Sequence, residues 1–433
     1  MNTLKKFFAL VAMSILPIWT MAQEVTREIS SHPDEFSIVR ETPDGRWLVY
    51  NFTSGLSYFS LVSDTASMAE MLQLGYNAGS NYTRLRDFEI FNDTVFFCGQ
   101  TGTKDTPKSI WGYFPLAGFP SVNVFVHENN FDYLKKLEVF SVDPTMNEIH
   151  VVMLGHKGGM DMVVDEMRVA PNQFIETRSE IFDPPMRFND IAVTDSHIVV
   201  AAEPLSGLLS NSKKTVFIEK PLSTGTYISG CNTYCRDRLS NHNSVLGNEL
   251  LVSCEREFCV LACIGSLPNS IVVTAYQGKN VYNTLYIPLS SVMPASLVSM
   301  CYGKRWRNLE LLTKVPGETQ SNIYSLYPAL AFYGGMVYQH IYHDENLASL
   351  DWLSTDDECV VASGHDDATS TLRVYRYNHS MWKPCTERDN TECYLGSEDK
   401  GPESVKPVYE VEEVTLVPLE SFESEKPMET ICK

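Results

Sequence analysis

The segment FSIVRETPDGRWLVY, residues 36–50, decides the fold. Two short runs within it, Phe36 to Val39 and Trp47 to Tyr50, are rich in aromatic and β-branched residues, and Asp44-Gly45 lies between them. Runs of this composition on either side of an Asp-Gly turn are typical of a β-hairpin. The segment therefore predicts two antiparallel strands near the start of the chain.

The same pattern of strand, tight turn and second strand recurs along the chain. Its turns are at residues 44, 93, 143, 195, 247, 303 and 356, about 50 residues apart. A further strand-like run follows most of these hairpins, as at 110–114, 162–164, 215–218, 285–287 and 372–375. Three or four strands per repeat is the content of a propeller blade. We therefore predict an all-β fold, a β-propeller of seven blades, with six or eight blades, a sandwich pair and a β-solenoid as alternatives.

The stretch Thr42 to Tyr50 resembles the Pro-Asp-Gly strand turn of TolB-like propeller repeats. The resemblance covers this one repeat, and the other six hairpins depart from it. It implies a propeller architecture and carries over no functional residue.

The N-terminus has the features of a secretory signal peptide. Lys5 and Lys6 precede an apolar run that ends near Trp19, and small residues follow around Ala22. We expect cleavage near Ala22, with an uncleaved anchor as the alternative, and a mature protein that is secreted, periplasmic or on the cell surface. The predicted parts of the chain are a signal peptide (1–22), a β-propeller (23–400) and an acidic C-terminal segment (401–433).

The acidic segment includes the stretch Val405 to Val417, which holds Val408, Val411, Val414 and Leu416 among charged residues. Two interpretations stay open for it. It supplies a strand that pairs into the first blade and closes the ring, or it is an irregular tail.

The chain is acidic, with a formal net charge of −20. Nucleic acids and anionic membranes both require basic surfaces, so this charge argues against either as a partner. After the leader no segment is apolar for long enough to cross a bilayer, so we expect no membrane insertion after cleavage. The sequence contains no P-loop, and we expect no cofactor.

All eleven cysteines follow the leader, and an exported chain reaches an oxidising compartment in which they can pair. Cys385 and Cys393 flank a polar loop and form the disulfide that we predict first. Five more cysteines between Cys231 and Cys263 are expected to supply one or two bridges, with a zinc site as the alternative. Cys98 lies within an apolar run, and the sequence agrees equally well with a buried free thiol and with a disulfide at this position.

Two groups of histidines and acidic residues are candidate metal sites. One is His340 with His343 and the acids that follow it, joined by His365. The other is His150 and His156, with Asp161 and Asp165 beyond them. Residues three apart on a strand point to opposite faces, and core or solvated histidines explain both groups better. We therefore predict no metal site.

The longest predicted loops are 64–84, 203–214 and 223–244, and loops are where propellers bind ligands. Tyrosines in these loops would suit stacking on sugars, although buried anchors of the loops are the alternative. The candidate ligand-binding residues are Tyr76, Tyr82, Tyr227 and Tyr234.

The sequence contains no Gly-x-Ser-x-Gly elbow and no His-Glu-x-x-His motif, so it names no catalytic residue. We predict an exported, non-catalytic propeller that binds a protein or a glycan. One alternative is a carbohydrate-active hydrolase or lyase with carboxylates at the channel mouth. Another is a structural component of a cell-envelope complex.

Overall fold

A computed structural model gives the structure of the chain, which divides into two units, Met1–Asp34 and Glu35–Lys433. All described residues belong to the second unit. They are 36–52, 56–62, 70–76, 81–103, 106–141, 148–181, 186–204, 214–219, 234–237, 250–255, 258–265, 270–277, 280–288, 296–302, 309–314, 321–326, 338–342, 349–355, 359–365, 372–378 and 409–411. Among them, no helix is long and apolar enough to span a membrane.

The described residues form seven four-stranded antiparallel sheets, each built from four consecutive strands. The first three sheets are β1 (Phe36–Glu41), β2 (Trp47–Phe52), β3 (Leu56–Val62) and β4 (Glu70–Tyr76); β5 (Asn81–Phe91), β6 (Thr94–Thr103), β7 (Pro107–Pro115) and β8 (Phe125–Asn129); and β9 (Tyr133–Phe140), β10 (His150–Lys157), β11 (Met160–Ala170) and β12 (Gln173–Ile181). The fourth and fifth sheets are β13 (Met186–Val193), β14 (His197–Pro204), β15 (Lys214–Glu219) and β16 (Tyr234–Asp237); and β17 (Leu250–Glu255), β18 (Phe258–Gly265), β19 (Ser270–Gln277) and β20 (Asn280–Pro288). The last two sheets are β21 (Ser296–Tyr302), β22 (Leu309–Lys314), β23 (Ser321–Leu326) and β24 (Tyr338–Tyr342); and β25 (Ser349–Thr355), β26 (Cys359–His365), β27 (Leu372–Asn378) and β28 (Tyr409–Val411).

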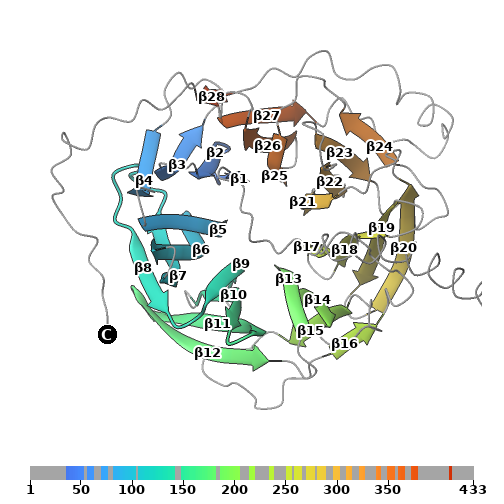
Figure 1. Cartoon of the computed structure of the whole chain (residues 1–433), viewed down its shortest axis with the longest axis horizontal. Coiled ribbons are helices and arrows are strands. Elements are labelled where there is room, and N and C mark those ends of the chain that lie inside the picture. Colours follow the sequence, from blue (N-terminus) through green and yellow to red (C-terminus); the bar gives the residue numbers. More distant parts are fainter. Residues whose placement is uncertain are drawn as a thin grey trace, which may run out of the picture. The chain divides into compact units, whose positions relative to one another are not determined.

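Figure 1 shows these sheets around a common centre, with the first strand of each sheet nearest to it. We call these seven strands the inner strands; they are β1, β5, β9, β13, β17, β21 and β25. The prediction of an all-β chain is confirmed, and the fold is propeller-like.

Six of the seven predicted hairpins are confirmed as the first two strands of a sheet. The turn at Asp44-Gly45 joins β1 to β2, and Gly45 has a φ of 82° that suits glycine. The turn at Asn92-Asp93 joins β5 to β6, and both residues have positive φ, as in the tight turns that favour Asn and Asp.

The fifth predicted hairpin is wrong. Leu250 to Val252 were expected as its second strand, after a turn at Gly247-Asn248, but they belong to the inner strand β17, which pairs with β18. The residues between β17 and β18 are Arg256 and Glu257, neither of which is a typical turn former. Gly247-Asn248 precedes the sheet and lies outside the described residues.

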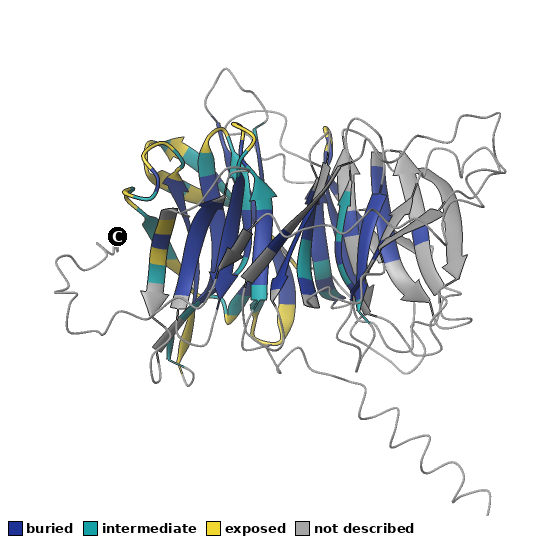
Figure 2. Cartoon of the chain, turned by 90° about the horizontal axis from the view of Figure 1, so that it is seen from above, coloured by how far each residue is buried: buried dark blue, intermediate teal, exposed yellow. Residues whose placement is uncertain are grey.

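The core lies between neighbouring sheets. One cluster, which includes Tyr50, Phe59, Phe88 and Phe114, joins the first two sheets. Further clusters join the second sheet to the third and the third to the fourth. Figure 2 shows buried residues along many of the strands and exposed ones at turns, at strand ends and on some strands. The first four sheets therefore bury faces against one another, as expected for repeats too small to fold alone.

The first and last sheets are also in contact. Val39 of β1 packs with Val361 of β26 and Val374 of β27. The Ser37 hydroxyl lies 3.0 Å from that of Ser363 on β26. Strand β28, from the segment 405–417, pairs with β27 as the fourth strand of the last sheet, rather than with the first sheet. The contacts between the first and last sheets thus involve side chains, and the backbone amide of Ser37 also donates to Asp351 Oδ2 on β25 at 3.2 Å.

Candidate functional site

Five of the seven inner strands contain a β-bulge at the same place in the strand. The residues that leave the register are Arg86, Lys135, Asn189, Val298 and Asp351. Each follows a fully buried apolar residue; these are Leu85, Leu134, Phe188, Leu297 and Leu350, all with 0% exposure. A bulge changes the direction of the next side chain. The side chain after each bulge therefore points in a direction that simple alternation along the strand would not give it.

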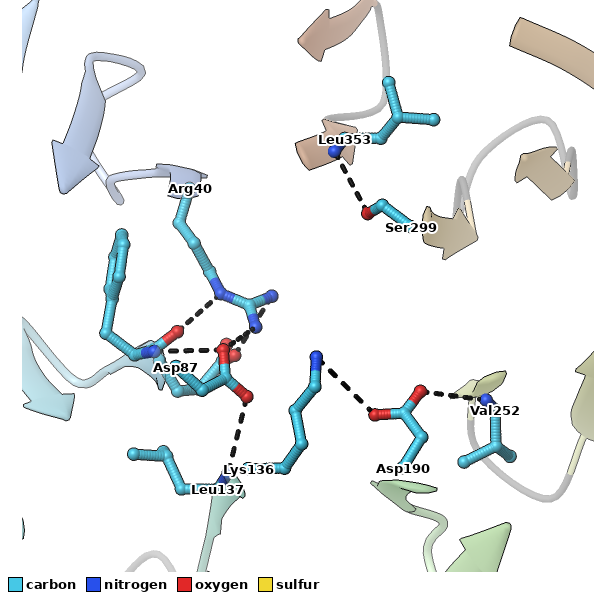
Figure 3. Close-up of polar contacts among 10 residues, drawn as sticks. Arg40, Asp87, Lys136, Leu137, Asp190, Val252, Ser299 and Leu353 are labelled. Carbon is cyan, nitrogen blue, oxygen red and sulfur yellow. Dashed lines mark hydrogen bonds and ion pairs between the residues drawn. The ribbon is translucent and has the colours of Figure 1, made fainter. Parts of the chain in front are cut away.

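The residues directly after the bulges are Asp87, Lys136, Asp190, Ser299 and Trp352. Figure 3 shows Asp87, Lys136 and Asp190, together with Arg40 from β1, extending toward one another from their strands. We call Arg40, Asp87, Glu89, Lys136, Glu138, Asp190 and Trp352 the central cluster.

Three residues after bulges accept a backbone hydrogen bond from the next inner strand. Asp87 Oδ2 accepts from the amide of Leu137 at 3.3 Å, and Asp190 Oδ2 accepts from that of Val252 at 2.9 Å. Ser299 Oγ accepts from the amide of Leu353 at 3.1 Å. These side chains therefore connect one sheet to the next.

Ion pairs join two further pairs of neighbouring sheets, the first to the second and the third to the fourth. A guanidinium nitrogen of Arg40 lies 3.2 Å from Asp87 Oδ1, and the other lies 3.2 Å from Glu89 Oε2. Lys136 Nζ lies 3.7 Å from Asp190 Oδ1. The side chains of Asp87 and Asp190 are 3% and 11% exposed, so these charges are desolvated and need their partners.

Trp352 lies among the cations of the central cluster. Lys136 Nζ is 4.3 Å and Arg40 Cζ 5.5 Å from the centroid of the Trp352 ring. These distances are within the range of cation–π attraction. Side chains from the first, third and last sheets therefore meet at the centre.

The pKa values of two carboxyl groups of the central cluster, Glu138 and Asp190, are raised. Burial raises the pKa of Glu138 well above its usual value, the charge of Glu89 raises it further, and Arg40 acts in the opposite direction. Burial also raises the pKa of Asp190, against the opposing effect of Lys136. Glu138 thus favours its neutral form beside Glu89, whose carboxylate is paired with Arg40.

The comparisons with known proteins leave the family open. No protein-family model matches the chain, and no curated protein matches it in sequence. Among solved structures it is similar to Sqt1 from Chaetomium thermophilum, with 10% sequence identity, a TM-score of 0.49, and coverage of 89% of this chain and 87% of that one. It is also similar to PpgL, a periplasmic gluconolactonase from Pseudomonas aeruginosa, with 11% identity, a TM-score of 0.48, and coverage of 87% and 96%. Likeness at this level assigns no function.

The candidate tyrosines were predicted to lie in loops, and the structure places three of them on strands. Tyr76 ends β4, Tyr82 is in β5 and Tyr234 begins β16. Tyr227 lies outside the described residues. The segment 64–84 is therefore no continuous loop, although ligand binding by these tyrosines stays a prediction.

The histidines of the first predicted group are separated. His340 is in β24 and His365 is in β26, which belong to different sheets. His343 and the acids after it lie outside the described residues.

The histidines of the second group each pair with one of the acids named beside them. His150 Nδ1 lies 3.0 Å from Asp165 Oδ1, and its Nε2 lies 3.0 Å from Glu148 Oε1. His156 Nδ1 lies 2.6 Å from Asp161 Oδ1. Within the part of the chain that the structure describes, no group of three or more His, Cys, Asp or Glu residues could hold a metal ion.

The cysteines are described in part. Cys98 is a buried free thiol, and Cys301 is also free. Cys259 is disulfide-bonded. The predicted pair Cys385 and Cys393 lies outside the described residues and stays a prediction.

No residue of the central cluster is among the site residues predicted from the sequence. A signal is present nonetheless, because a buried apolar residue stands two positions before a polar or aromatic one in five inner strands. This pattern is only three residues long, and the residue at its end differs in chemistry from strand to strand. The five copies can be recognised only after the strands are aligned on their bulges.

Proposed function

We propose that the seven sheets are the blades of a closed seven-bladed propeller. The contacts of Ser37 and Val39 with the last sheet support this closure. The double variant Ser37→Cys with Ser363→Cys tests it, because two thiols at the observed separation can form a disulfide after small adjustments. A disulfide within one chain is expected on mild oxidation. Its absence, while each single variant folds, would contradict closure.

We further propose that the protein is exported and binds a protein or glycan partner without catalysing a reaction. One observation carries this proposal: Asp87, Asp190 and Ser299 are engaged in hydrogen bonds between sheets. The cations of the central cluster pair with Asp87, Glu89 and Asp190 in the same way. Polar groups used to hold sheets together are a structural support, which leaves the outer faces for recognition.

A glycan array and a pull-down with the mature chain test the binding function, combined with a hydrolysis screen on any glycan that is bound. Binding to one class of partner without a change in the partner is the expected outcome. Conversion of a bound glycan into product would overturn the non-catalytic assignment. N-terminal sequencing of the exported protein tests cleavage after Ala22.

Four exposed apolar side chains on the third sheet favour a protein partner in an envelope complex. They are Met160 (39%), Val169 (46%), Ile175 (44%) and Ile181 (52%), all on the neighbouring strands β11 and β12. Exposed apolar groups at a sheet edge are typical of surfaces that bind proteins. Ile175→Asp and Val169→Asp should reduce recovery of a protein partner in the pull-down, whereas Lys108→Asp on the second sheet should not.

The alternative function is a carbohydrate-active hydrolase or lyase, and the pair Glu138 and Glu89 favours it. Glu138 has a raised pKa, as a general acid needs, and Glu89 is a carboxyl group close enough to raise it. Glu138→Gln should abolish any turnover while binding remains. Equal turnover by this variant and the wild-type protein would exclude Glu138 as the acid.

A further inference from the structure

Four side chains meet where the third sheet contacts the fourth, away from the central cluster. Lys135, the bulge residue of β9, donates from Nζ to Asp161 Oδ2 at 2.7 Å and to the carbonyl of Phe188 on β13 at 2.9 Å. Asp161 Oδ2 also accepts the amide of Phe188 at 2.7 Å. Asp161 therefore holds Lys135 in place and fixes the junction between the two sheets.

His156 is oriented by the same acid. Its Nδ1 lies 2.6 Å from Asp161 Oδ1, and its ring stacks on the Tyr133 ring at a centroid distance of 4.8 Å and an interplanar angle of 8°. Tyr133 and His156 face each other across β9 and β10 in the strand register. The imidazole is thus held from one edge and one face, which fixes the direction of Nε2.

The side chains of Lys135 and His156 are partly exposed to solvent. The side chains of Lys135 and His156 are each 22% exposed, whereas Asp161 is 4% exposed. Within the described part of the chain, the hydrogen bonds of His156 engage Nδ1, and none engages Nε2 or the Tyr133 hydroxyl. Both atoms are therefore available to a ligand.

The charge around Tyr133 differs from that of the chain as a whole. Burial raises the pKa of Tyr133, Asp161 and Asp132 raise it further, and Arg187 and Arg86 act in the opposite direction. Both guanidinium groups are thus within electrostatic reach of the hydroxyl, and Lys135 Nζ lies 5.6 Å from the Tyr133 ring centroid. Three cations thus surround Tyr133 against two carboxylates, in a chain whose net charge is −20.

We propose that Tyr133, Lys135 and His156 form a subsite for the carboxylate of an acidic sugar. The Tyr133 hydroxyl donates to one carboxylate oxygen, and His156, whose Nδ1 is engaged by Asp161, binds the other oxygen through Nε2. Lys135 supplies the positive charge, as charge-assisted hydrogen bonds to a carboxylate require. The half-buried Tyr133 ring offers an apolar edge to the sugar, as tyrosine does in recognition surfaces.

This inference rests on the proposed glycan-binding function and names its ligand class. It commits to a carboxylate on a sugar, because the exported chain is expected to meet polysaccharides and because the site combines an aromatic ring with donors. A polymer of galacturonate and a neutral dextran of similar length are the probes.

The test compares binding of both polymers by the folded mature protein and by two variants that preserve shape. Tyr133→Phe removes the hydroxyl and keeps the stacked ring, and His156→Phe removes both nitrogens and keeps the stack. Asp161 retains Lys135 and the Phe188 amide in both variants. Lys157→Met is the matched control, because it removes an exposed cation next to His156 that lies over Phe131 instead.

The wild-type protein is expected to bind polygalacturonate and not dextran, and each of the two variants to bind it at least about tenfold more weakly, as expected for loss of a hydrogen bond to a charged group. The control should bind like the wild-type protein. Unchanged affinity in both variants would overturn the subsite. Binding of neutral glycans or of a protein, without polygalacturonate, would overturn the subsite and leave the proposed function standing. Failure to bind any glycan or protein would remove both.

Discussion

Lys136 Nζ lies 4.3 Å from the centroid of the Trp352 ring, although Lys136 belongs to the third sheet along the chain and Trp352 to the last. Both residues directly follow a bulge in their inner strand. The contact therefore depends on two backbone irregularities that are far apart in sequence. It also links sheets that share no hydrogen-bonded strand.

Lys136→Met should lower the free energy of unfolding by about 2 kcal/mol, because it leaves Asp190 desolvated without its cation and removes the attraction to Trp352. The Met side chain keeps the contact of the aliphatic stem with the ring. Urea unfolding measures the loss. Lys108→Met is the control, since Lys108 pairs with Glu128 at the surface, where such pairs contribute less than about 1 kcal/mol. Equal losses in the two variants would contradict a structural role for the central cluster.

Glu166 on β11 predicts a dependence of stability on pH. Its carboxylate accepts a hydrogen bond from Trp111 Nε1, and burial raises its pKa to about 7. A Glu in the unfolded chain titrates near pH 4.3, so the folded state retains the proton longer and stability falls as the pH rises from about 4.3 to about 7.

Glu166→Gln removes this titration and keeps an acceptor for Trp111. The variant should be more stable than the wild-type protein by about 2 kcal/mol at pH 8, and should lose that advantage at pH 4. Urea unfolding at both values measures the difference. A difference that is the same at pH 4 and pH 8 would show that Glu166 does not titrate in this window.

His150 predicts a second pH dependence of the unfolding free energy, at higher pH than that of Glu166. Burial lowers its pKa, but Asp165 and Glu148 more than compensate and raise the pKa above its usual value. The stabilisation from the charged imidazole is complete below about pH 6.5 and is lost as the pH rises through the folded pKa. The unfolding free energy of the wild-type protein should therefore decrease above this pH, and that of His150→Gln should not. Parallel curves for the two proteins would refute the prediction.

The disulfide of Cys259 should be formed with Cys254. The two residues are directly opposite each other on β17 and β18, and opposite residues of an antiparallel pair bring their Cβ atoms within bridging distance. Peptide mapping under non-reducing conditions should recover this pair, together with Cys385–Cys393. Linkage of Cys259 to Cys263 or Cys235 would contradict the assignment.

Cys98 should remain unmodified by a thiol reagent in the native protein. It is fully buried, and burial raises its pKa well above the usual value, so both access and the thiolate are lacking. Modification in step with global unfolding is the expected result. Rapid modification under native conditions would show that the second sheet opens locally.

Most of the strands could be predicted from the sequence because hairpins depend on neighbouring residues. Asn92-Asp93 and Asp44-Gly45 form their turns through local backbone preferences, and the strands on either side are β-branched or aromatic. The fifth hairpin could not be found in this way, because Arg256 and Glu257 between its strands carry no turn signal. Gly247-Asn248, which precedes β17, has the composition of a turn and led to the wrong position for this hairpin.

The central cluster could not be predicted for a different reason. A bulge inserts one residue and changes which side chains face the centre, and alternation of apolar and polar residues does not reveal it. The pairing of Arg40 with Asp87 joins two repeats, and local patterns contain no information on which acid another repeat presents. His150 and Asp165 belonged to one candidate metal group in the sequence. Their contact depends on the register of β10 and β11, which the sequence does not reveal.

Each of the seven sheets is made of four strands that are consecutive in the chain, and β28 completes the last sheet rather than the first. The first and last described strands, β1 and β28, therefore do not share a sheet. A circularly permuted gene, with new ends placed between any two sheets and the old ends joined, would encode seven undivided sheets. The contacts of Ser37 and Val39 with the last sheet would then lie between consecutive sheets, and the order of synthesis of the repeats could be changed without cutting a hydrogen-bonded ladder.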